Sequence, residues 1–241
     1  MSVKRYATSR RRISALKRAL CAAGVLCAFA ACGDNADPGD GEPVDVTGEL
    51  LPFKAGNSWT YQVTEDGETS SKVTTIGAEE LVGGTGPHQD ARAYKVVTKK
   101  GAADMTVSWQ ASVEGRIVRY REQSFHASTG ALELEEHWDP AKLHIDDSPA
   151  HRAAGSDWLE EYKETKTDPI NGTVETTTER DHWYVDSVDE SISVPAGTFR
   201  AVVFRKVGGS SSKTYWYVRG IGKVRETGGQ TEELMSYEVA P

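Results

Sequence analysis

The sequence predicts an all-β domain, an antiparallel meander that forms either a strongly curved sheet or a barrel-like β domain. Apolar and polar residues alternate along many short segments, which is the pattern of half-buried strands. Turn signals recur every 8–16 residues, and no segment carries a sustained apolar period of 3.6 residues. Because consecutive strands joined by short turns pair antiparallel, a meander follows.

The first predicted strand covers residues 57–64, where Trp59, Tyr61 and Val63 share one face. Glu65-Asp66-Gly67 predicts a turn after it, and residues 79–81 are predicted as a single helical turn. In the strand at 116–121, Val118 and Tyr120 are expected to face inward. The other strands predicted in this half are 71–76, 92–98, 105–113 and 131–138.

In the second half, Asp139-Pro140 is expected to end a strand, and residues 142–145 form a short separate one. Asp168-Pro169-Ile170-Asn171-Gly172 predicts a hairpin turn, because Pro stands early and Asn-Gly late. The strands predicted here are 158–167, 173–188, 192–194, 198–207, 213–219, 223–226 and 232–239.

Two segments carry apolar residues on both faces. Phe199, Ala201 and Val203 face one way, whereas Val202 and Phe204 face the other. Residues 215–218 likewise place apolar side chains on both faces. Such strands need cover on both sides, which a loop, a second sheet layer or an apolar ligand can provide.

The amino-terminal residues predict export. An uncharged apolar run at 19–32 follows seven basic residues and no acidic ones, and it is too short to span a membrane. Phe29-Ala30-Ala31-Cys32 resembles the lipobox of bacterial lipoproteins. The resemblance implies removal of residues 1–31 as a lipoprotein signal peptide and attachment to the membrane through acyl chains on Cys32. Simple secretion with cleavage elsewhere is the alternative.

Residues 32–48 are rich in Asp, Gly and Pro and predict a disordered acidic tether, so residues 49–241 form a single all-β domain. Gly33 follows the cysteine where Asp often marks inner-membrane retention in related systems. We therefore expect an outer-membrane lipoprotein of the cell envelope, facing the periplasm or the surface.

Charge argues against nucleic acid as a partner. The chain has 28 basic and 36 acidic residues, and seven basic ones lie in 1–31, so the mature chain carries a net charge of −15. Such a surface repels nucleic acid and anionic headgroups.

The sequence indicates no catalytic residue, metal site or cofactor. Cys21 and Cys27 lie in the predicted signal peptide, and Cys32 would carry the lipid, so the mature domain has no free thiol. Glu135 and His137 share a strand face, but nothing supplies a third metal ligand, so surface polar residues are the better interpretation. No Gly-x-Ser-x-Gly elbow is present. We therefore expect a protein that is not an enzyme.

Three motifs together resemble a broad group of uncharacterised bacterial lipoproteins and secreted proteins. They are a GNxWxY segment, a VPAGTF strand entry and a YWYxxGxGxV hairpin. The resemblance implies a curved antiparallel sheet and no activity. We interpret the motifs as structural, because Pro and Gly suit strand ends and bulges. Their residues are Trp59, Tyr61, Pro195, Gly197, Phe199, Tyr215, Trp216, Gly220 and Gly222.

The sequence thus predicts a lipid-anchored envelope lipoprotein with a non-catalytic binding or scaffolding β domain, whose partner is an apolar ligand or an envelope protein. A carrier of an apolar ligand, such as a lipid acyl chain, is the alternative, since its tryptophans would line a hollow sheet. An envelope hydrolase or metalloenzyme ranks third.

Overall fold

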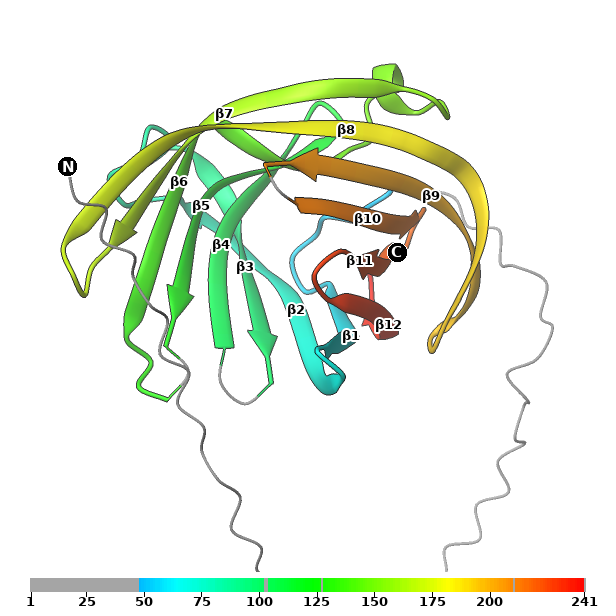
Figure 1. Cartoon of the computed structure of the whole chain (residues 1–241), viewed down its shortest axis with the longest axis horizontal. Coiled ribbons are helices and arrows are strands. Elements are labelled where there is room, and N and C mark those ends of the chain that lie inside the picture. The colour runs from blue at the N-terminus through cyan, green and yellow to red at the C-terminus, as the bar shows by residue number, and fades with distance from the viewer. Residues whose placement is uncertain (1–47, 102–103, 127, 210, 241) are drawn as a thin grey trace, which may run out of the picture. The chain divides into compact units, whose positions relative to one another are not determined.

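The computed structural model describes residues 48–240, apart from 102–103, 127 and 210. These residues form one closed antiparallel barrel in which every strand pairs with its neighbours in the chain and β1 pairs with β12 (Figure 1). The prediction of an all-β meander is therefore confirmed in its barrel form. The strands are β1 (Ser58–Glu65), β2 (Glu68–Leu81), β3 (Arg92–Lys100), β4 (Asp104–Val113), β5 (Arg116–Phe125), β6 (Leu132–Asp146), β7 (Asp157–Asp168), β8 (Thr173–Val194), β9 (Gly197–Gly208), β10 (Ser211–Val218), β11 (Gly222–Thr227) and β12 (Thr231–Glu238).

Two boundaries differ from the sequence predictions. Residues 79–81 belong to β2 and pair with β3, so the predicted helical turn is wrong. Asp139-Pro140 lies inside β6 and does not end it, because the strand continues to Asp146. Proline lacks only its own N–H, and the ladder to β7 stops at Asp139, so the chain loses no bond by continuing. A short 3-10 helix, η1 (Pro149–His151), follows.

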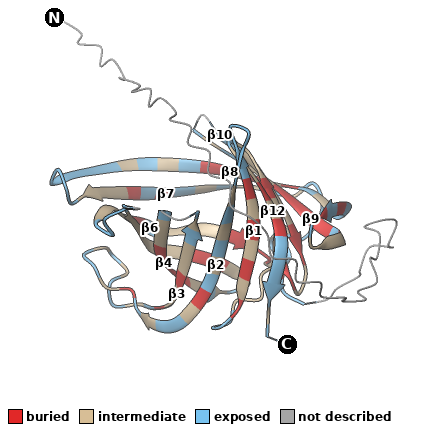
Figure 2. Ribbon diagram, turned by 90° about the horizontal axis from the view of Figure 1, so that it is seen from below, coloured by how far each residue is buried: buried red, intermediate tan, exposed pale blue. Residues whose placement is uncertain are grey.

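Burial alternates along β1, where Trp59, Tyr61 and Val63 are buried and their neighbours are not (Figure 2). On β5 the predicted direction is wrong. Arg119 lines the barrel cavity, and Tyr120, expected inside, packs against His88 of the 82–91 loop, with the ring centroids 4.6 Å apart. That loop covers the outer face of this part of the barrel, where its Val82 packs in one core cluster with Trp109 of β4. Apolar residues here pack outward, so the inner face is left to polar ones.

The strand with two apolar faces is covered on both sides. Phe199 and Ala201 of β9 belong to one core cluster, and Val202 and Phe204 belong to another. The segment before β1 supplies part of this cover, since Leu50 is 1 % exposed and joins the second cluster.

Residues 48–53 close one end of the barrel. Leu50 N donates to Asp147 Oδ2 (3.3 Å), and Gly220 N donates to Glu49 O (2.8 Å). Arg219 forms a bidentate pair with Asp147, with both distances 3.0 Å. We call this the plugged end. The turns β1–β2, β7–β8 and β11–β12 lie at the opposite end, because successive hairpin turns alternate between the two ends of a meander.

At two places side chains replace the strand ladder. β11 and β12 pair only at 225–226 with 232–233. Beyond that point Trp59 Nε1 donates to Ile221 O (2.5 Å), and Tyr61 Oη donates to Lys223 O (3.0 Å). β6 and β7 pair only at 135–139 with 163–167. Beyond this paired stretch, the Glu160 carboxylate accepts hydrogen bonds from Leu143 N and from Trp183 Nε1.

Gly222→Ala tests the first of these closures. Gly222 has φ +111°, and a Cβ there would lie 3.0 Å from Trp59 Nε1. Backbone strain and the displaced indole together predict a loss of about 2–4 kcal/mol in the free energy of unfolding. Urea unfolding measures it. Gly229→Ala is the control, because Gly229 also has positive φ but open space around it. Equal losses in the two variants would mean that the Trp59 contact contributes nothing.

Candidate ligand-binding site inside the barrel

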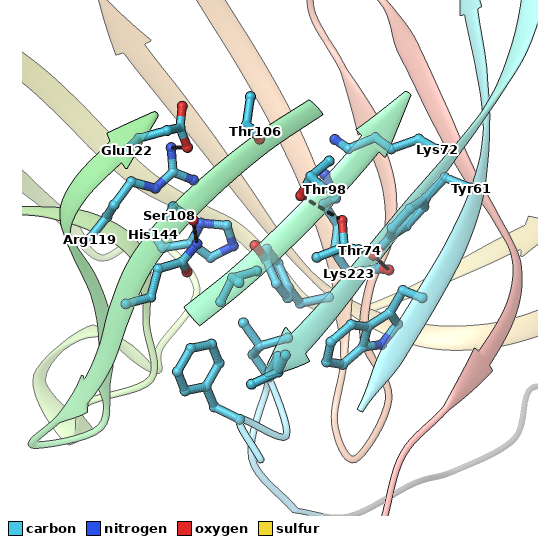
Figure 3. Close-up of a pocket in the computed structure, with 17 residues that line it drawn as sticks. Tyr61, Lys72, Thr74, Thr98, Thr106, Ser108, Arg119, Glu122, His144 and Lys223 are labelled. Carbon is cyan, nitrogen blue, oxygen red and sulfur yellow. Dashed lines mark hydrogen bonds and ion pairs between the residues drawn. The ribbon is translucent and has the colours of Figure 1, made fainter. Parts of the chain in front are cut away.

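The barrel is hollow. Two spaces of about 250 Å³ and 380 Å³ lie inside it and share Lys72, Arg119, His144, Tyr217 and Lys223 among their lining residues, so we treat them as two parts of one cavity. Figure 3 shows the side chains of Lys72, Arg119 and His144 among those that line the first part. Interiors of this size suit small-molecule ligands.

The part nearer the plugged end has a mixed lining and holds most of the apolar side chains of the cavity, so we call it the apolar part. Leu51 and Phe53 of the plug line it, and so do Trp59 and Ile76. Its polar groups are mostly neutral and bonded to one another. The remaining lining residues of this part include Tyr61, Thr74, Val96, Thr98, Thr106, Ser108, Gln110 and Glu122.

The other part, which we call the cationic chamber, is lined by six cationic side chains and only two carboxylates. It extends toward the open turns, since Gln230 lies in the β11–β12 turn. The carboxylates are Glu226 and Glu232. The cations are Lys72, Arg119, Lys142, Lys206, Lys213 and Lys223.

Three lysines share the two carboxylates. Lys72 Nζ lies 2.6 Å from Glu232, Lys213 Nζ lies 2.7 Å from Glu226, and Lys223 Nζ contacts both. Glu232 is 1 % exposed. This five-residue group, which we call the lysine triad network, therefore carries one net positive charge in a buried setting.

The pKa directions agree with an excess of positive charge. Burial lowers the pKa of Lys72, and Lys223 lowers it further, although Glu232 lies beside it. Burial raises the pKa of Glu232, but Lys223 and Lys72 outweigh this and bring it below its ordinary value. Burial also opposes the charge on Lys223, but the two carboxylates hold its pKa well above the ordinary value. Both carboxylates are thus ionised at neutral pH.

His144 lies where the two parts meet. Burial lowers its pKa to about 3, and Arg119 and Lys223 act in the same direction, so its imidazole is neutral at pH 7. It makes no hydrogen bond with the described residues, and three of the cavity hydroxyls bond to other groups. Thr74 pairs with Thr98 (3.1 Å), and Ser108 accepts from Gln110 (2.8 Å; Figure 3).

We predict that His144→Gln makes the free energy of unfolding less sensitive to acid. The folded chain keeps His144 neutral down to about pH 3, whereas the unfolded chain protonates it near pH 6.5. Stability from this residue is therefore complete above pH 6.5 and is lost as the pH falls toward 3. After allowance for water in the cavity, the wild type should lose about 2 kcal/mol more than the variant between pH 7 and pH 4.5. Urea unfolding at both pH values measures this, and parallel losses would contradict it.

The structure brings the sequence motifs together. Trp59, Tyr61 and Phe199 belong to one core cluster, against which Trp216 packs. The Gly222 backbone lies against Trp59. Ala196 N, between Pro195 and Gly197, donates to Leu234 O (2.9 Å), and Gly220 N binds the plug. Of these motif residues, Trp59, Tyr61 and Tyr215 also line the cavity. Cys32 lies outside the described residues.

Glu135 and His137 lie 2.9 Å apart, and Arg121 pairs with the same Glu135 carboxylate at 2.6 Å. Within the part of the chain that the structure describes, no three His, Cys, Asp or Glu residues gather as a metal site. Nor does any described helix have the length and apolar character to span a membrane.

No protein-family model matches the chain, and no curated protein matches it in sequence. Among solved structures, the chain is similar to a protein from Parabacteroides distasonis described as a lipoprotein. The TM-score is 0.38 at 12% identity, and the match covers 80% of this chain and 100% of the other.

Proposed function

We propose that the barrel binds a small organic anion with an apolar body, and that it does so without catalysing a reaction. The observation that carries this proposal is the lysine triad network, in which three buried or half-buried lysines share two carboxylates. A buried charge without a partner is costly, and an anionic ligand would compensate it. The apolar part of the cavity would receive the rest of the molecule.

This ligand class differs from a plain hydrocarbon. A carrier of acyl chains alone would need an apolar lining, whereas the chamber is lined by six cations. An amphipathic anion fits both parts of the cavity. Among the described residues, His144 makes no hydrogen bond with the hydroxyls of Thr74, Thr98 or Ser108, which favours a binding role over activation of one of these hydroxyls as a nucleophile.

We also propose that the protein is a cell-envelope lipoprotein attached through Cys32, with the outer membrane as its location. The apolar run and the lipobox-like residues before Cys32 support this. Palmitate labelling that is lost in Cys32→Ala, and processing that globomycin blocks, would support the anchor. A native protein that retains residues 1–31 would contradict it.

Isothermal titration calorimetry with three compounds that carry a ten-carbon chain tests the binding role. Decanoate should bind, whereas decanol and decyltrimethylammonium should bind at least about tenfold more weakly, because a charge-assisted bond contributes more than about 1.4 kcal/mol. Equal binding of decanol and decanoate, or no binding of either, would contradict the proposal.

Lys213→Met provides the matched variant. The Lys213 side chain is 38 % exposed, so its loss should be tolerated by the fold, and the triad network becomes neutral. Decanoate affinity should fall. Lys95→Met is the control, because Lys95 is equally accessible, pairs loosely with Glu80 (3.9 Å) and does not line the cavity.

A further inference from the structure

A second group of cations lines the cationic chamber, separate from the lysine triad network. Arg119 of β5, Lys142 of β6 and Lys206 of β9 belong to it. Their carboxylate partners are Glu122, Glu164 and Asp181, and none of these lines the chamber. The second group therefore presents positive charge to the chamber, while Glu164 and Asp181 do not line the cavity and Glu122 lines only its apolar part.

The compensation of Lys142 is incomplete. Lys142 Nζ lies 3.5 Å from Glu164, which binds Lys166 more closely at 2.8 Å and accepts from Trp138 Nε1 at 3.0 Å. One carboxylate is thus divided between two lysines. Lys142 also lies over the Trp138 ring, 5.1 Å from its centroid, so an aromatic face supplies part of its stabilisation.

The other two cations are paired but not saturated. Lys206 Nζ lies 3.0 Å from Asp181, whose same oxygen also accepts from Tyr162 Oη at 3.1 Å. Arg119 pairs with Glu122 at 2.6 Å through one terminal nitrogen, and its Nε is buried without a hydrogen-bond partner among the described residues.

These three cations repel one another. Burial is the main reason why the pKa of Lys142 lies below its ordinary value, and Lys206 and Arg119 lower it further despite the opposing effect of Glu164. A ligand with a single negative charge would satisfy the triad network and leave this repulsion in place. A second negative charge would relieve it.

The kinds of donor indicate the shape of the head group. Five of the six cations are lysines, which act as point charges approaching from several walls of the chamber. A planar carboxylate is best matched by the two-pronged arginine fork, and only one arginine is present here. A tetrahedral group with three terminal oxygens can accept from several directions at once.

We propose that the cationic chamber receives a doubly charged phosphomonoester head group, held between the lysine triad network and the group of Arg119, Lys142 and Lys206. This inference rests on the proposed function, since it names the class of anion that the same cavity takes. The apolar body of the ligand lies toward Trp59, Ile76 and the plug.

Decyl phosphate and decyl sulfate test it by calorimetry, because the two share a tail and differ in charge. At pH 7.5 decyl phosphate should bind about tenfold more tightly or better, as expected for additional charge-assisted bonds. A phosphomonoester loses its second proton near pH 6, so the preference should shrink toward unity at pH 5.5. Decyl sulfate stays a monoanion, so any change in its affinity between the two pH values comes from groups of the protein. Glu136 and Glu160 are such groups, because burial raises their pKa values.

Lys142→Met should weaken decyl phosphate binding by a larger factor than decyl sulfate binding, so the phosphate preference at pH 7.5 should fall. Lys163→Met, an exposed lysine on β7, is the matched control and should change neither. Equal affinities of decyl phosphate and decyl sulfate at pH 7.5 would overturn the inference and leave the proposed function standing. Failure of both compounds and of decanoate to bind would overturn the proposed function itself.

Discussion

Glu232→Gln is expected to destabilise the barrel by about 3–5 kcal/mol, the usual cost of removing one partner from a buried ion pair. Glu232 is 1 % exposed and contacts Lys72 (2.6 Å) and Lys223 (2.8 Å). Its loss leaves three lysines facing Glu226 alone, so the net positive charge of the network doubles. Urea unfolding at pH 7 and low salt measures the change.

Lys213→Met is the opposite case in the same network. It removes the excess cation and leaves two lysines with two carboxylates, so it should cost at most about 1 kcal/mol, as for a half-exposed pair. The excess charge in Glu232→Gln should also attract anions, so added phosphate should restore part of its stability. Similar losses in the two variants, or no effect of phosphate, would show that the network carries no excess charge.

Apolar and polar alternation predicted the strands well, but it did not always predict which face of a strand points into the barrel. Alternation in residues 57–64 predicted Trp59 and Tyr61 inside correctly, because the outer face of β1 is polar and only partly buried. On β4 the same alternation holds, but Ser108 and Gln110 line the cavity while Val107 and Trp109 pack outward under the 82–91 loop. Alternation separates two faces of a strand and does not say which of them faces the interior.

The site was harder to predict than the fold. Lys72, Lys142 and Lys206 each stand on a strand beside apolar residues, where a lysine usually points to solvent. Only closure of the sheet into a wide barrel turns these lysines toward one another, and closure depends on pairing between β1 and β12, which are far apart in the sequence. The Trp59 motif and the Gly222 motif were found in the sequence, but their contact across this closure was not.

Asp147→Ala should be the second large loss, because this residue fastens the plug. Asp147 is 8 % exposed. Its carboxylate forms a bidentate pair with Arg219 and accepts hydrogen bonds from Leu50 N at 3.3 Å and from Arg152 Nε at 3.1 Å. Removing it leaves two guanidinium groups without this partner, and we expect a loss of about 3–4 kcal/mol. Release of Leu51 and Phe53 would also open the apolar part of the cavity, so decanoate affinity should fall as well.

Asp186→Ala provides a control with the same chemistry in a different setting. Asp186 also binds an arginine in a bidentate pair, with distances of 2.9 and 3.0 Å to Arg205, but both side chains are more than one-third exposed. An exposed pair of this kind contributes about 0–1 kcal/mol, and Asp186 does not touch the plug. Hydrogen exchange at residues 48–53 should therefore rise in Asp147→Ala and stay unchanged in Asp186→Ala. Equal exchange in both variants would mean that the apolar contacts of Leu50 alone keep the plug in place.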